Sequence, residues 1–279
     1  MALTLFYITN KAEIALIAER NGVDRIWIDL ETLGKEERQR SIDSVKSHHT
    51  IDDIKTIKPL LTKSEMLVRV NPWNNASKEE IDEVVDAGAD IIMLPMWKNT
   101  EDVERFLSAV GHRTKTTLLL ETKEAVECID KVLELDFDEI HIGLNDLHLS
   151  YGMTFMFEPL SNGIVEFLCE KFKKRCIPYG FGGIARLGDG LLPAEKIIME
   201  HYRIGSTRAI LSRSFCDNAS LESMDQFEKV FAENIKKLRE FEDKVREMPQ
   251  KKLLDNKESI IISVAEIVDK IERSRKDEC

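Results

Sequence analysis

The chain has 279 residues, of which 43% are hydrophobic, and this is enough for a large buried core. Its formal net charge of -11 argues against a general nucleic-acid or membrane-surface binder, because phosphate groups would be repelled. No apolar run reaches the roughly 18 residues of a transmembrane helix, and the first residues lack the pattern of a secretion signal. The five cysteines form no C-x-x-C pair. We therefore expect a cytoplasmic globular protein without a disulfide framework or a zinc site.

Short apolar segments alternate with amphipathic helical segments through most of the chain. Several of these segments are apolar on both sides, as is typical of parallel strands that helices cover. Strands are predicted at 3–8, 25–30, 66–70, 90–96, 116–121, 139–144, 177–183 and 207–213. Helices are predicted at 123–135, 163–176, 193–202 and 225–245, and a further helix is predicted to begin with a capping box at Ser77 and Glu80. Eight such repeats predict an α/β fold, a closed (β/α)8 TIM barrel.

A C-terminal helical extension is predicted beyond the barrel. We expect residues 1–217 to form the barrel core and residues 218–279 to form a helical region that completes it. A break near Met248 and Pro249 precedes a last helix, predicted at 256–273. Its stripe of isoleucine and valine side chains predicts an arm that packs on its own barrel or on a neighbouring subunit, and hence a homo-oligomer.

Candidate functional residues follow the predicted strands, because chemistry in parallel barrels lies at the C-terminal strand ends. They are Asp29, Glu31, Arg69, Glu121, Asn145, Asp146, Gly182, Gly183 and Arg186. Carboxylates that follow two strands are suited to one hard cation, Mg²⁺ or Mn²⁺, and an arginine beside them to a carboxylate or a developing enolate. The glycine pair with Arg186 is suited to a second anionic group.

Structural roles remain open for the same residues. Glu121 and Asp146 would alternatively be helix caps, and Arg69 would form a bridge to Asp29 or Glu31. Asp29 and Glu31 would orient Arg69 or lie on a solvated rim. The glycines would alternatively only turn the chain, with Arg186 paired to Asp189 or Glu195.

Five motifs resemble the HpcH/HpaI aldolase and citrate lyase beta-subunit family, which is part of the phosphoenolpyruvate/pyruvate superfamily of barrels. They are W-I-D-L-E (27–31), V-R-V-N (68–71), G-A-D-I-I-M-L-P-M (88–96), E-T-K-E-A (121–125) and I-G-L-N-D-L-x-x-S-Y-G (142–152). The resemblance implies that Glu121 and Asp146 are Mg²⁺ or Mn²⁺ ligands and that Arg69 contacts the substrate's reacting oxygen. It also implies that main-chain N–H groups around Asn145 and Asp146 hold the substrate carboxylate.

One position departs from the aldolase pattern, because Thr32 stands where those aldolases have a base histidine. The D-L-E form is more similar to the citrate lyase branch, which recognises thioesters. Separately, His48 and His49 lie in a polar connection and are expected to face solvent. The resemblance implies a carbon–carbon lyase that acts on a 2-oxo acid or an acyl substrate through a metal-stabilised enolate. Two alternatives remain: a catalytically weakened barrel that serves as a binding or scaffold subunit, and an enzyme for phosphorylated or thioester substrates.

Overall fold

The computed structural model describes residues 2–34, 48–216 and 223–277. Its eight parallel strands are hydrogen-bonded in chain order and close into a barrel. They are β1 (Thr4–Ile8), β2 (Arg25–Asp29), β3 (Glu65–Arg69), β4 (Ile91–Leu94), β5 (Lys115–Leu120), β6 (Glu139–Ile142), β7 (Tyr179–Ile184) and β8 (Arg208–Leu211). Every predicted strand is present, and the predicted (β/α)8 fold is confirmed. Two residues at the ends of predicted strands begin helices instead, Leu144 an α-helix and Arg213 a 3-10 helix.

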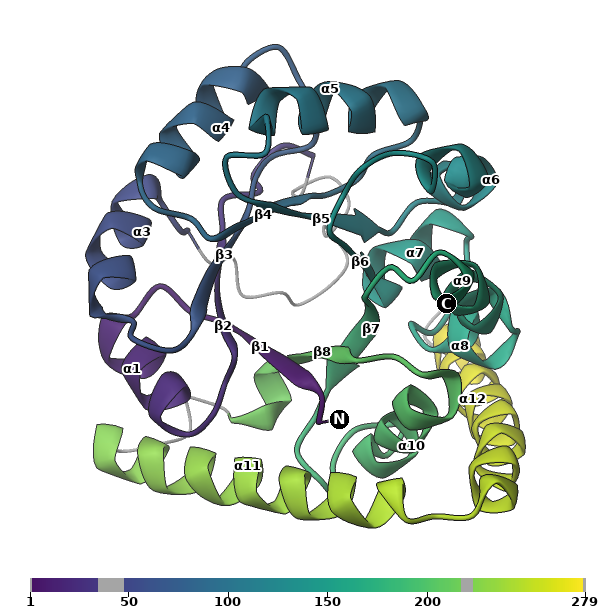
Figure 1. The fold of residues 1–279 in the computed structure, drawn as a ribbon. Coiled ribbons are helices and arrows are strands. Elements are labelled where there is room, and N and C mark those ends of the chain that lie inside the picture. The colour runs from purple at the N-terminus through teal and green to yellow at the C-terminus, as the bar shows by residue number, and fades with distance from the viewer. Residues whose placement is uncertain (1, 35–47, 217–222, 278–279) are drawn as a thin grey trace. The chain divides into compact units, whose positions relative to one another are not determined.

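The chain divides into two compact units, and the first unit comprises Leu5–His141. Figure 1 shows its helices on the outer side of the strands that they connect. They are α1 (Ala12–Arg20), α3 (Ile51–Ile57), the short 3-10 helix η1 (Lys58–Leu60), α4 (Ser77–Asp86), α5 (Thr100–Val110) and α6 (Lys123–Val132). All five residues of β2 and all four of β4 are buried, as expected for strands that helices cover on one side and that face the barrel interior on the other.

The start of α4 differs from the prediction. Its N-cap is Ala76, which has no side-chain cap hydrogen bond. The Ser77 hydroxyl accepts a hydrogen bond from Asn74 N at 2.9 Å instead, and the Glu80 carboxylate accepts from Asn71 Nδ2 at 2.7 Å. The predicted capping box is therefore wrong, because both of its side chains bind the connection that leads from β3.

The second unit comprises Met1–Thr4 and Ile142–Cys279. Its helices are α7 (Leu144–Ser150), α8 (Glu158–Ser161), α9 (Ile164–Lys174), α10 (Ala194–Ile204), the 3-10 helix η2 (Arg213–Phe215), α11 (Met224–Arg246) and α12 (Gln250–Asp277). The break between α11 and α12 falls at the predicted Pro249. The last helix begins six residues earlier than predicted, at Gln250 instead of 256.

The last helix packs on its own chain. Figure 1 shows α12 running beside α10, and Ile260 and Val264 of its apolar stripe are 1% and 2% exposed. Lys196 of α10 donates to the hydroxyls of Ser259 and Ser263 at 2.7 and 2.8 Å. Of the two predicted positions for the arm, packing on the same chain is confirmed, and the homo-oligomer stays a prediction.

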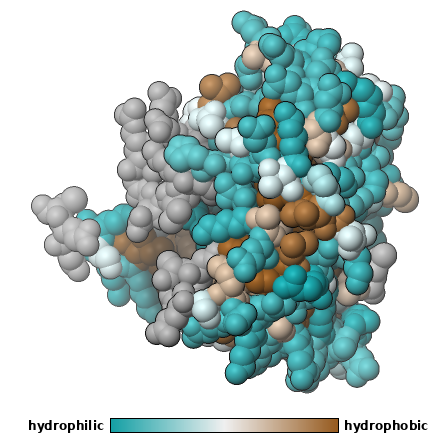
Figure 2. Space-filling model, turned by 90° about the vertical axis from the view of Figure 1, so that its left-hand side faces the viewer, coloured by the Kyte–Doolittle hydropathy of each residue, from teal (hydrophilic) through white to brown (hydrophobic). Residues whose placement is uncertain are grey.

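One face of the molecule is mostly polar. Figure 2 shows hydrophilic side chains over most of one face, with a smaller apolar area between them. Among the described residues, no helix has the length and apolar character needed to span a membrane.

Candidate functional site

Strands β2 and β3 bring an aspartate and an arginine together at their C-terminal ends. Asp29 and Arg69 are register partners, so their side chains leave adjacent strands at the same level. Arg69 donates from Nε to Asp29 Oδ1 and from Nη2 to Asp29 Oδ2, both at 2.8 Å. This two-point contact fixes the plane of the guanidinium.

A second carboxylate completes the support of Arg69. Glu31 Oε2 lies 3.1 Å from Arg69 Nη2. The guanidinium carbon of Arg69 lies over the ring of Trp27, 5.3 Å from the ring centroid. The side chains of Arg69, Asp29 and Glu31 are 12%, 5% and 2% exposed. Asp29 and Glu31 therefore both contact Arg69 and fix its orientation. The alternative that these two carboxylates lie on a solvated rim is wrong.

Electrostatics keep Arg69 charged. Burial alone would lower its pKa, but the carboxylates of Asp29, Glu31 and Glu121 outweigh burial and raise the pKa above the usual range of arginine. Among the described residues Nη1 of Arg69 has no hydrogen-bond partner. The site therefore presents a permanent, rigidly held cation.

Glu121 follows β5 and is 2% exposed. Its Oε1 accepts a hydrogen bond from the main-chain N–H of Met96 at 3.1 Å. The cap of α6 is the next residue, because Thr122 Oγ1 accepts from Ala125 N. The alternative that Glu121 is a helix cap is therefore wrong, and its effect on the pKa of Arg69 places it within electrostatic reach of that side chain.

An amide that follows the end of β3 holds the connection after β2, a contact that the sequence analysis did not predict. Asn71 Oδ1 accepts from the main-chain N–H groups of Thr32 and Leu33 at 2.9 and 3.0 Å. Glu80 holds this amide in turn, and burial raises the pKa of Glu80 despite its hydrogen bonds to Asn71. Thr32 thus serves to anchor the segment that carries Glu31. Asn71 was quoted in the V-R-V-N motif, but nothing in the motif indicates this contact.

The adjacent histidines differ in environment. His48 is exposed as predicted, whereas His49 is only 9% exposed. His49 Nδ1 accepts a hydrogen bond from the main-chain N–H of Asp29 at 2.9 Å. The prediction that His49 faces solvent is wrong, because its ring serves as the acceptor for a buried strand-end amide.

In the second unit, Asn145 and Asp146 lie in the first turn of α7. The N-cap of this helix is Gly143, which has no side chain, so the alternative that Asp146 is the N-cap is also wrong. Both residues are partly buried. Their predicted roles, a metal ligand at Asp146 and a substrate carboxylate held by main-chain N–H groups, remain predictions.

Gly182, Gly183 and Arg186 belong to the end of β7 and the connection that follows. Gly182 has φ +53°, and a Cβ there would lie 2.8 Å from Leu144 Cδ1, so its backbone conformation and its close packing both require glycine. Arg186 is 56% exposed and bonds Asp189 through Nε at 3.0 Å. This pair is the alternative considered for Arg186, and an anion-binding role for the three residues remains a prediction.

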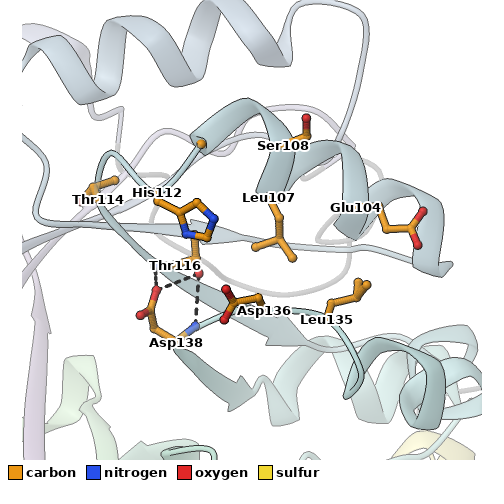
Figure 3. Close-up of a pocket in the computed structure, with 10 residues that line it drawn as sticks. Glu104, Leu107, Ser108, His112, Thr114, Thr116, Leu135, Asp136 and Asp138 are labelled. Carbon is orange, nitrogen blue, oxygen red and sulfur yellow. Dashed lines mark hydrogen bonds between the residues drawn. The ribbon is translucent and has the colours of Figure 1, made fainter.

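A pocket of about 390 Å³ lies elsewhere in the first unit. Figure 3 shows that α5 and the residues before β6 contribute to its lining, with hydrogen bonds between two further lining residues, Thr116 and Asp138. Thr116 is near the start of β5, and Asp138 directly precedes β6. The pocket is therefore at the N-terminal ends of these strands, opposite the end that carries Glu121, and includes none of the predicted site residues.

The predicted metal ligands fit a hard cation by their chemistry. Among the described residues there is no group of three or more His, Cys, Asp and Glu side chains that could hold a metal. Two carboxylates would therefore leave the remaining positions of the shell to water and substrate oxygens, as Mg²⁺ allows. Glu121 is a buried carboxylate that does not act as a helix cap, and two carboxylate ligands fit Mg²⁺ or Mn²⁺ better than zinc.

Comparisons with known proteins bear on the fold and the family of the chain. No match was found among curated proteins. A crystal structure of an HpcH/HpaI aldolase from Desulfitobacterium hafniense DCB-2 has a TM-score of 0.60 at 15% identity, over 89% of this chain and 94% of that one. The citrate synthase SbnG has a TM-score of 0.57 at 16% identity, over 76% of this chain and 86% of its own.

These two likenesses concern the fold alone. The family model for HpcH/HpaI aldolase/citrate lyase matches residues 2–156, the part that contains Asp29, Arg69, Glu121 and Asp146. The chain therefore belongs to the HpcH/HpaI aldolase/citrate lyase family.

Proposed function

We propose that the protein is a metal-dependent carbon–carbon lyase that acts on a 2-oxo acid or an acyl substrate. The family indicates an enzyme of the aldolase or citrate lyase type. The observation that carries the finer proposal is the partly buried Arg69, held by Asp29 and Glu31 at the C-terminal ends of the strands, with Glu121 in electrostatic reach.

Glu121 and Asp146 would hold Mg²⁺ or Mn²⁺. When bound, the cation supplies positive charge for the carboxylate and carbonyl oxygens of the substrate and for the enolate that forms as the carbon–carbon bond breaks. The donor chemistry of the two residues supports this assignment.

Arg69 would stabilise the same developing charge from the protein side. Its Nη1 would donate a hydrogen bond to the enolate oxygen, while Nε and Nη2 stay with Asp29 and Glu31. Since these two carboxylates already fix the guanidinium, little reorganisation is needed when charge develops, and this is the condition under which such donors stabilise a transition state most.

Asn145 would contribute main-chain binding of the substrate carboxylate together with Asp146. The first-turn N–H groups of a helix point away from its other turns and lack acceptors within it. Their position in α7 supports this role.

Turnover of a substrate panel tests the proposal. The panel comprises oxaloacetate, 4-hydroxy-2-oxo acids and acyl thioesters, each with Mg²⁺, with Mn²⁺ and with EDTA. We expect turnover of at least one compound with metal and none with EDTA. Glu121→Gln and Asp146→Asn should abolish it, whereas Glu124→Gln, a control at an exposed carboxylate of α6, should not.

Two results would contradict the proposal. Full activity of Glu121→Gln and Asp146→Asn in metal-free buffer would exclude the metal assignment. Metal binding without turnover of any compound would favour a scaffold subunit, which the presence of Thr32 in place of the aldolase histidine motivates.

A further inference from the structure

The main-chain N–H of Asp29 lies beyond the last register pair of β1 and β2. In β2 the N–H and C=O groups of alternate residues face β1, and Thr9 N donates to Trp27 O at 3.2 Å. The register of β1 and β2 ends at Ile8 and Trp27. Asp29, two residues later, therefore faces the same side beyond the end of β1. A buried N–H without an acceptor is costly, so the group that accepts from Asp29 N contributes to holding this strand end.

His49 supplies that acceptor. Its Nδ1 lies 2.9 Å from Asp29 N. Because a main-chain N–H can only donate, Nδ1 carries no proton, and the neutral ring carries its proton on Nε2.

The start of α3 fixes where His49 lies. Thr50 is the N-cap of α3 and forms a capping box with Asp53, with the Thr50 side chain accepting from Asp53 N and the Asp53 side chain accepting from Thr50 N. Two reciprocal hydrogen bonds restrict the backbone at residue 50. The capping box therefore also restricts the position of His49, the residue directly before Thr50, next to the end of β2.

Asp29 is the link between this imidazole and the arginine of the site. Both of its carboxylate oxygens bind Arg69, and Oδ1 also accepts from Glu31 N at 3.2 Å. The main chain and the side chain of Asp29 are thus both held, the former by His49 and the latter by its two partners. A shift of this backbone would displace the plane of the guanidinium.

We propose that His49 is a positioning residue for the Asp29–Arg69 pair and that it acts as an unprotonated Nδ1 acceptor. This inference rests on the proposed function only for its effect on ligand binding, since the effect on Arg69 itself can be measured without any ligand.

Three substitutions distinguish the acceptor role from other roles of a ring. Asn places its amide oxygen about where Nδ1 lies, Gln places it further out, and Ala removes it. His48→Ala is the matched control, because His48 is the adjacent, exposed histidine. The first readout is the ¹⁵N spectrum of the wild-type histidine rings, in which His49 should show an unprotonated Nδ1 and a protonated Nε2.

The second readout is solvent exchange of the Nε–H proton of Arg69, which bonds Asp29. We expect exchange about tenfold faster in His49→Ala and His49→Gln, and unchanged in His49→Asn and His48→Ala. The third readout is oxalate affinity with Mg²⁺, which should follow the same order.

Each outcome decides the proposal. A proton on Nδ1 would overturn it, as would unchanged Arg69 exchange in His49→Ala. Equally fast Arg69 exchange in His49→Asn and His49→Ala would also overturn it, because an acceptor atom at the position of Nδ1 would then not be enough to hold Asp29. If His49→Ala does not fold, the wild-type ring spectrum and His49→Asn still decide. Absence of oxalate binding by the wild type would contradict the proposed function and leave the first two readouts to judge His49.

Discussion

Substitution of Gly182 by alanine should destabilise the fold by two separable effects. The first is conformational, because φ is +53° and the left-handed region costs a non-glycine residue roughly 1–2 kcal/mol. The second is steric, because the new Cβ would lie 2.8 Å from Leu144 Cδ1 and 3.3 Å from Leu144 Cγ. Leu144 is 1% exposed, so it has little room to move, and overpacking of this kind costs roughly 1–3 kcal/mol. We therefore expect a total loss of about 2–5 kcal/mol.

Gly152 provides the matched control. It has φ +68°, and a Cβ there would meet no atom within 4 Å, so Gly152→Ala should cost only the conformational part, about 1–2 kcal/mol. Urea unfolding at constant m-value measures both losses. In a Leu144→Ala background, the added cost of Gly182→Ala should fall to that of Gly152→Ala. Equal losses for Gly182→Ala and Gly152→Ala in the wild-type background would refute the steric argument.

Four further predictions concern other parts of the molecule. Arg69→Lys should weaken oxalate binding with Mg²⁺ about tenfold in calorimetry, because lysine cannot reproduce the two-point contact with Asp29; unchanged affinity would exclude Arg69 from the ligand. Arg186→Ala should leave that affinity within about twofold, since Arg186 pairs with Asp189; a larger loss would place it in the site. The hydrogen bond from Arg203 and the charge of Lys257 lower the pKa of Glu166. The ionised Glu166 therefore stabilises the fold above about pH 4.3, and this contribution is lost as the pH falls through the lowered pKa. Glu166→Gln should make the free energy of unfolding depend less on pH in the acid range, and an unchanged dependence would contradict this. A chain that ends at Pro249 loses buried Ile260 and Val264 and should unfold at lower temperature, while light scattering of both chains tests the predicted homo-oligomer, which a monomer in both cases would contradict.

The fold could be predicted from the sequence because its strands are short, apolar on both sides and separated by helices. That pattern is specific to covered parallel strands. It fails where a buried helix begins directly after a strand, as at Leu144, because an apolar residue there fits either structure. The pair of Asp29 and Arg69 could also be predicted as one alternative, since both residues end adjacent strands.

Other contacts could not be predicted, because they join residues that no local pattern relates. His49 reaches Asp29 from a position 20 residues later in the chain, and its burial depends on where α3 begins. Ser77 and Glu80 match a capping box in spacing, yet the chain before α4 offers them Asn74 and Asn71 as nearer partners. Sequence spacing indicates which hydrogen bonds are possible, and the tertiary fold selects among them.

Calorimetric titration of oxalate in the presence of Mg²⁺ tests the central claim most directly, because oxalate presents two adjacent oxygens as the enolate of a 2-oxo acid does. We predict saturable binding with Mg²⁺, no binding with EDTA, and loss of binding in Glu121→Gln and Asp146→Asn but not in Glu124→Gln. Binding of equal strength with EDTA, or no binding by the wild-type protein with either Mg²⁺ or Mn²⁺, would contradict a metal-dependent lyase.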